Sequence, residues 1–112
     1  MWDGAFGLSY GLYATTSSLA FPPGSGGASP PYAIAVQNGT TPINVTMYTP
    51  SPNVGVMWCH EVLNFGTGAG TITIKGASTG NPTIGSIPAG KRAEIVWNPM
   101  ASPQDWVVFL SA

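Results

Sequence analysis

The residues of this sequence best suited to chemistry are a cysteine and a histidine that stand side by side, Cys59 and His60. Each is the only residue of its type, so a disulfide within the chain is excluded. On a strand the two side chains point to opposite faces. One chain therefore builds neither a Cys–His nucleophilic pair nor a metal site, which needs about four ligands. A His60 ring on a threefold axis stays open. The alternative is a strand histidine that is hydrogen-bonded or packed in an interface.

Carboxylates are the second group that suggests chemistry, because a pair of them can hydrolyse glycosides. The acids are Asp3, Glu61, Glu94 and Asp105. Glu61 and Glu94 both fall in predicted strands and could face each other, although four acids do not single out any pair. The simpler interpretation is that Glu94 forms an ion pair across strands with Lys75 or Lys91.

The glycine-rich stretch 66–70 reads GTGAG and superficially resembles a phosphate-binding loop. Such a loop needs Gly-Lys-Ser/Thr leading into a helix, whereas this one leads into a strand pattern. A glycine loop between two strands is the better interpretation. No serine stands in a nucleophile-elbow motif either. We therefore expect no enzyme, no catalytic residue, no cofactor and no metal.

Aromatic residues suggest a carbohydrate-binding platform, made by Trp58, Trp97, Trp106 and Tyr48. Polar partners for a sugar are available in Asn64, Asn81, Asn98, Gln104 and Arg92. Tryptophans pack in a core or between subunits more often than they bind sugars, so we favour packing.

The composition excludes several classes of partner. Charged residues make up 6% of the 112 residues, against roughly 25% in an ordinary soluble domain. A net charge of −1 cannot supply the basic field that nucleic-acid binding needs. No apolar run approaches the roughly 18 residues of a membrane helix, and the first residues lack the positive region of a signal peptide. An uncharged surface of this kind is usually covered, in an oligomer or on a larger assembly.

From residue 32 onward, the pattern predicts one strand after another. The predicted strands are 32–37, 43–48, 54–65, 71–75, 83–87, 91–97 and 105–110. Asn38-Gly39 predicts a hairpin turn, and Pro88-Ala89-Gly90 a tight turn. Apolar residues on both faces of 54–65 indicate a central or interface strand. About seven short strands predict an all-β domain over 32–112, a small antiparallel β-sandwich or jelly-roll-like barrel.

Residues 1–31 differ from the rest of the sequence, because their apolar residues follow neither the two-residue period of a strand nor the 3.6-residue period of a helix. Glycine, serine and proline surround the aromatic side chains Trp2, Phe6, Tyr10, Tyr13 and Phe21. We expect an extended N-terminal arm whose aromatics dock on a partner. The alternative is an irregular first strand that covers its own domain.

Residues 70–110 read GTITIKGASTGNPTIGSIPAGKRAEIVWNPMASPQDWVVFL. This succession of a TITIK strand, a SIPAGKRAEIVWN hairpin and a closing DWVVFL strand resembles small β-domains of tailed-bacteriophage virion proteins. Such domains occur in head-decoration (cement), head-fibre and tail-fibre proteins. The resemblance rests on Pro88–Lys91, Ile95–Trp97 and Trp106. It implies a structural role, commonly a trimeric state, and no catalytic residues.

The resemblance and the arm together predict a capsid decoration protein that binds the major capsid protein and stabilises the shell. It would form a homotrimer, stand on the capsid surface of the virion, and lie in the host cytoplasm before assembly. Nucleic acid and membrane are not expected as partners. The alternative is a receptor-binding β-module of a head or tail fibre that binds a glycan.

Overall fold

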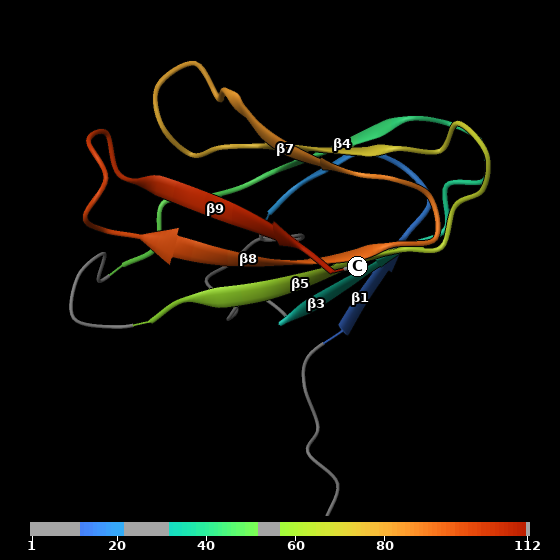
Figure 1. Ribbon diagram of the computed structural model, residues 1–112, viewed down its shortest axis with the longest axis horizontal. Coiled ribbons are helices and arrows are strands. Elements are labelled where there is room, and N and C mark those ends of the chain that lie inside the picture. Colours follow the sequence, from blue (N-terminus) through green and yellow to red (C-terminus); the bar gives the residue numbers. More distant parts are fainter. Residues whose placement is uncertain (1–11, 22–31, 52–56, 112) are drawn as a thin grey trace, which may run out of the picture.

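The computed structural model describes residues 12–21, 32–51 and 57–111. In this part of the chain nine strands form two sheets, and no helix is present. The strands are β1 (Leu12–Thr15), β2 (Leu19–Ala20), β3 (Ala33–Val36), β4 (Ile43–Thr46), β5 (Cys59–Asn64), β6 (Ile72–Lys75), β7 (Thr83–Ile87), β8 (Arg92–Asn98) and β9 (Asp105–Leu110). One sheet has the order β1-β3-β5-β8-β9 and the other β2-β4-β6-β7. The two sheets lie face to face as layers (Figure 1).

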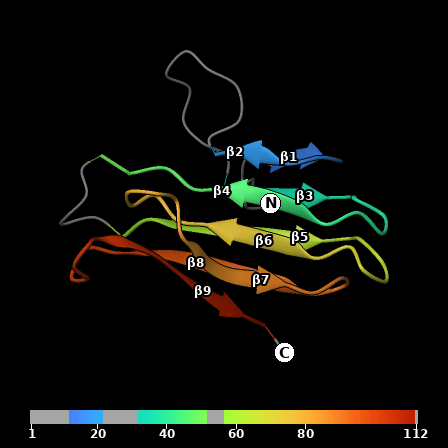
Figure 2. The ribbon, with the colours of Figure 1, turned by 90° about the horizontal axis from the view of Figure 1, so that it is seen from above.

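The first six strands alternate between the two sheets. β1, β3 and β5 are parallel neighbours in one sheet, and β2, β4 and β6 in the other. β7, β8 and β9 then add antiparallel pairs at the far end, as Figure 2 shows from above. The predicted all-β fold in two layers is confirmed. The expectation of antiparallel strands throughout is wrong, and the sheets do not close into a barrel.

The two predicted turns form, but they do not make the predicted hairpins. The Thr41 N–H donates to the Asn38 carbonyl at 3.0 Å, with Gly39 at a φ of 59°. The turn nevertheless carries the chain from β3 to β4 in the opposite sheet. Likewise the Lys91 N–H donates to the Pro88 carbonyl at 3.1 Å, where the chain crosses from β7 to β8. Alternation in a sequence indicates the face of a residue but not the neighbour of its strand.

The core lies between the layers and contains the residues that alternation places inward. It is formed by Phe21, Ile34, Val36, Ile43, Val45, Met47, Val62, Ile72, Ile74, Ile87, Ala93, Ile95, Trp97 and Trp106. The predicted inward positions of Ile72 and Ile74 are confirmed, because both are fully buried. Trp97 and Trp106 stand opposite each other on β8 and β9. The Trp106 Nε1–H donates to the Tyr48 carbonyl at 2.7 Å, which ties β9 to the layer above.

Part of the segment expected to be an arm lies within the two sheets. β1 runs beside β3, and β2 runs beside β4. The Phe21 N–H donates to the Thr46 carbonyl at 2.7 Å, and the Phe21 side chain is 3% exposed. Residues 1–11 and 22–31 lie outside the described part, so the docking role of the arm stays a prediction.

Candidate functional site

His60 lies inside the core, where both of its ring nitrogens have partners. Its Nδ1 is 3.2 Å from the Tyr32 carbonyl and its Nε2 is 2.8 Å from the Tyr48 hydroxyl. A carbonyl can only accept, so Nδ1 carries the hydrogen and Nε2 accepts from Tyr48. Burial raises the pKa of Tyr48 to about 12, which keeps this donor protonated. His60 is therefore a hydrogen-bonded strand residue, one of the two possibilities that the sequence left open. Because its side chain is only 3% exposed, it cannot reach a metal on a threefold axis between chains.

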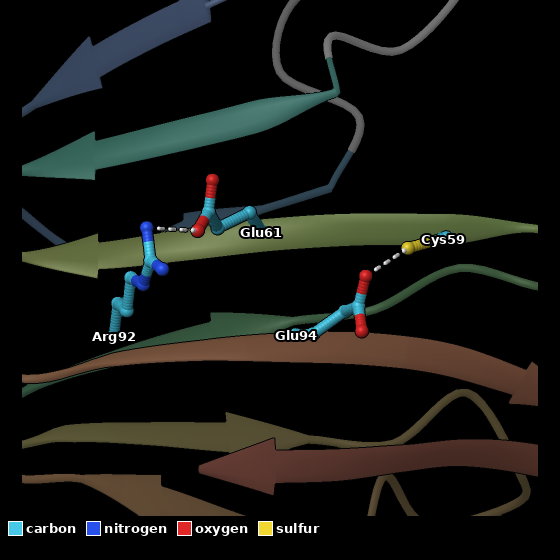
Figure 3. A network of polar contacts seen from close by, with 4 residues as sticks. All are labelled: Cys59, Glu61, Arg92 and Glu94. Atoms are coloured by element: carbon cyan, nitrogen blue, oxygen red, sulfur yellow. Dashed lines mark hydrogen bonds and ion pairs between the residues drawn. The ribbon is translucent and has the colours of Figure 1, made fainter. Parts of the chain in front are cut away.

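Cys59 points to the opposite side of β5, as alternation predicts, and joins a polar cluster on the outside of the sheet (Figure 3). Its Sγ donates to Glu94 Oε2 at 3.1 Å. Burial, followed by the hydrogen bond and charge of Glu94, raises the pKa of the thiol to about 11. Burial and the neighbouring Cys59 also raise the pKa of Tyr32 to about 12. Because the thiolate is the nucleophile, a thiol that stays protonated at neutral pH is a poor one.

The two strand glutamates face each other, because Glu61 on β5 is directly opposite Glu94 on β8. Each already has a partner. Arg92 Nη1 lies 3.3 Å from Glu61 Oε2, and Glu94 accepts from Cys59 rather than from Lys75 or Lys91 (Figure 3). The pair stands on an open sheet surface. Among the described residues, none encloses a sugar at this pair or excludes water from it, as glycoside hydrolysis would require.

The most distinctive surface is the side of the five-stranded sheet that points away from the core, here called the outer face. By register it carries the residues that alternate with the buried ones on β1, β3, β5, β8 and β9. Its exposed apolar side chains are Leu12, Phe65, Val107 and Phe109, at 62%, 54%, 37% and 56%. Among them lie the charged residues Glu61, Arg92 and Glu94, which are held in the cluster described above. The outer face therefore combines exposed apolar side chains with one ion pair and one exposed carboxylate, Glu94, which is hydrogen-bonded to a neutral thiol.

Shallow hollows lined by described residues border the outer face. One of about 450 Å³ lies between Ala14, Ala35 and Phe65. A second of about 350 Å³ lies on the other side of Phe65, beside Lys91 and Arg92. A third of about 250 Å³ lies along Val96, Val107 and Phe109. An exposed apolar surface with hollows into which a partner's side chains fit is typical of protein docking sites.

The predicted docking residues have different outcomes. Trp2, Phe6 and Tyr10 lie outside the described residues. Tyr13 is on β1 and 40% exposed, whereas Phe21 is buried in the core of its own chain. Sequence reasoning did not single out Phe65, Val107 and Phe109. The signal that could have found Phe65 was the run 54–65, where apolar residues occupy both faces.

The tryptophan platform for a sugar, the less favoured of the two interpretations, does not form. Trp97 and Trp106 are 4% and 2% exposed and pack against each other, with ring centroids 5.4 Å apart. Trp58 is half-buried against the core. This agrees with the favoured interpretation, in which the tryptophans pack.

The described residues also lack two features that would suggest other functions. No group of three or more His, Cys, Asp or Glu side chains there is arranged to hold a metal ion. Within the same residues, no helix has the length and apolarity of a membrane span.

Compared with protein-family models, with curated proteins and with solved structures, the chain shows no significant match to any of them.

Proposed function

We propose that this chain is a structural protein of a tailed-phage virion, a capsid decoration protein that binds the major capsid shell and stabilises it. The observation that carries the proposal is the outer face, an exposed apolar surface with hollows and few free charges. The resemblance of residues 70–110 to virion β-domains supplies the virion context. The protein would act by binding and not by catalysis.

The chemistry of the outer face suits a permanent protein contact. Large apolar side chains such as Phe65 and Phe109 contribute roughly 1.5–3 kcal/mol each when they become fully buried. The Glu61–Arg92 pair can stay intact at the rim of a contact, where it favours correct orientation more than affinity. Self-association would add contacts on the capsid surface. Before assembly the chain would lie in the host cytoplasm.

The test adds the purified chain to tailed-phage capsids assembled without it. We expect co-sedimentation with the shell and a higher temperature of shell rupture. Because the face is apolar, binding should change little between low and high salt, whereas an electrostatic contact would weaken markedly. A reconstruction of the particle should place the chain on the shell. Density on the tail instead would overturn the decoration proposal in favour of the fibre.

Two matched variants locate the contact. Phe109→Ser removes an exposed ring from the outer face, and Met100→Ser removes an 88% exposed side chain from the loop between β8 and β9. We expect the first change to weaken shell binding at least about tenfold, the effect of losing one well-buried apolar contact. The second should leave binding unchanged. Equal binding by both variants would exclude the outer face as the docking surface.

A further inference from the structure

Both sheets end on the same side of the molecule in a strand that has a partner on one edge only. In the described part of the chain, β1 pairs with β3 alone and β2 pairs with β4 alone. Figure 2 shows the two strands together at one end of the layers, opposite β7 and β9. The molecule thus presents two strand edges side by side, one from each layer.

The register identifies the backbone groups that point out of the β1 edge. The Thr15 carbonyl accepts from the Gln37 N–H at 2.9 Å, so the backbone groups of Thr15 and Tyr13 face β3. In a parallel pair, alternate residues use both of their backbone groups toward one neighbour. The N–H and C=O groups of Leu12 and Ala14 therefore point away from the sheet.

Within the described residues, this edge has none of the features by which proteins usually block an open strand. Edge strands are commonly protected by lysine, proline, a bulge or a covering segment. Residues 12–21 read LYATTSSLAF and contain no charge, glycine or proline. Leu12 and Tyr13 are 62% and 40% exposed at the edge. An edge of this composition is suited to pairing.

We propose that two copies of this chain pair edge to edge through β1 and β2, about a twofold axis perpendicular to the sheets. Such an axis makes the two β1 strands antiparallel and keeps each sheet in line with the same sheet of the second copy. Leu12 then stands opposite Ala14 of the second copy, which satisfies the free N–H and C=O groups of both residues. Tyr13 meets its own symmetry mate on the axis, as a close, non-hydrogen-bonded pair.

The occupant is a second copy because only a molecule with two edges at the same spacing satisfies β1 and β2 together. A second copy of the chain carries the same two edges at the same spacing. A twofold interface is also the commonest way in which identical chains associate. Residues 1–11 are the competing occupant, but Gly4, Gly7 and Gly11 make them a poor strand. By register Tyr13 shares the inward side of Ile34, so its pair continues the core across the junction. The inference does not rest on the virion function.

Cross-linking in the full chain tests the register. In a Cys59→Ser background, Tyr13→Cys places two thiols face to face on the axis, within reach of a disulfide. Leu12→Cys is the matched control, because in this register the two Leu12 residues are diagonal neighbours, too far apart for one. We expect Tyr13→Cys to form the cross-linked dimer at least about tenfold faster than Leu12→Cys. Equal rates for the two variants would overturn the register.

Light scattering on the unmodified chain tests the pairing itself. We expect a mass of twice 11.5 kDa. Ala14→Pro removes an N–H that points out of the edge while leaving the β1–β3 bonds, and it should shift dimer dissociation to at least about tenfold higher concentration. The proposal would be overturned if the chain were a monomer at every concentration or a trimer. It would also be overturned if Ala14→Pro left the protein folded and its dimer mass unchanged. If the chain is a monomer and the Leu12 and Ala14 amides lose their protection from hydrogen exchange when residues 1–11 are deleted, the edge pairs with that segment instead.

Discussion

One buried amide joins three separate parts of the chain. Asn64 is 3% exposed, and its Nδ2 donates to the carbonyls of Gly70 and Ile87 at 2.9 and 2.8 Å. Its Oδ1 accepts from the Gly66 N–H at 2.8 Å. A residue of this type is retained in a core because every polar atom has a partner, and losing one costs about 1–3 kcal/mol. The sequence alone did not indicate this role.

Gly66 packs so closely against this amide that no side chain fits there. A Cβ at Gly66 would meet Asn38 Oδ1, the Gly39 carbonyl at 2.8 Å and Asn64 Oδ1 at 2.9 Å. We expect Gly66→Ala to lower the free energy of unfolding by roughly 1–3 kcal/mol or more through steric overlap. The measurement is urea unfolding followed by fluorescence.

The control for this change is Gly80→Ala. Gly80 has a φ of 85° and nothing within 4 Å of a Cβ, so its substitution causes backbone strain alone, about 1 kcal/mol. If Gly66→Ala proved as mild as Gly80→Ala, the turns around Asn38 and Asn64 would be packed less closely than described.

Asp105 holds the loop between β6 and β7 against the start of β9. Its Oδ1 accepts from the Ala77 N–H at 2.8 Å, and its Oδ2 accepts from the Ser78 hydroxyl at 2.6 Å. Burial acts to raise the pKa of this carboxyl, but the hydrogen bonds from Ser78, Ala77 and Trp106 outweigh burial and lower the pKa. The charged form is therefore the one that the folded state stabilises.

The lowered pKa predicts an acid-sensitive loop. The Asp105 carboxyl has a lower pKa in the folded state than in the unfolded state, where it is about 3.9. Its contribution to stability is therefore complete above about pH 3.9 and is lost as the pH falls through the folded-state pKa. We expect the unfolding temperature to drop on acidification below about pH 4, and Asp105→Asn to make this dependence shallower. Thermal scans from pH 2 to 7 measure both. Parallel curves for the two proteins would contradict the assignment.

Loss of Trp106 should destabilise the protein strongly. Its ring lies against Trp97, Tyr48 and His60, with centroids 5.4 to 5.5 Å away. Truncating a buried tryptophan costs roughly 3–5 kcal/mol, a large share of the stability of a small domain. We expect Trp106→Ala to shift the urea midpoint strongly and Met100→Ala, at an 88% exposed position, to leave it nearly unchanged. An unmoved midpoint for Trp106→Ala would contradict the packing.

At the scale of elements, the sequence predicts where strands lie much better than how they pair. The ranges 83–87 and 105–110 coincide with β7 and β9, and 32–37 and 71–75 contain β3 and β6. Alternation and turn residues are local, and they were sufficient for this. Ile34 pairs with Val62 and Val45 with Ile74, and no local pattern indicates such distant partners. The outer face was missed for the same reason, because it forms only when β1, β3, β5, β8 and β9 lie side by side.

The N-terminal segment divides at the start of β1, and truncations should show this. Deleting residues 1–11 leaves β1, β2 and the buried Phe21 in place, so we expect a cooperative unfolding transition close to that of the full chain. Deleting residues 1–31 removes both strands and Phe21, and should lower the free energy of unfolding by at least the 3–5 kcal/mol of a lost core aromatic. Chemical denaturation of the two truncated chains measures the difference. Equal free energies of unfolding for the two truncated chains would show instead that the whole of 1–31 is an arm outside the folded domain.

At the scale of the whole molecule, low charge and exposed apolar area occur together. The outer face and the β1–β2 edges lie on different sides of the sandwich, so a pair of chains joined at the edges would keep both outer faces free. Such a pair could bind a shell at two points, and two linked contacts hold more tightly than either alone.

The parallel winding of the first six strands has a consequence for synthesis. Each parallel pair joins residues far apart in the chain, as Ile34 and Val62 are, whereas the hairpins β6–β7 and β8–β9 are local. Local hairpins form in about 1–10 µs, while distant pairings must first overcome loop-closure entropy. β8 lies between β5 and β9, so the larger sheet cannot be completed before its last residues have been made. A growing chain would therefore carry an unfinished core until β9, with the buried Trp106, has been made and can pair with β8, and a product that ends before Trp106 would be exposed to proteases.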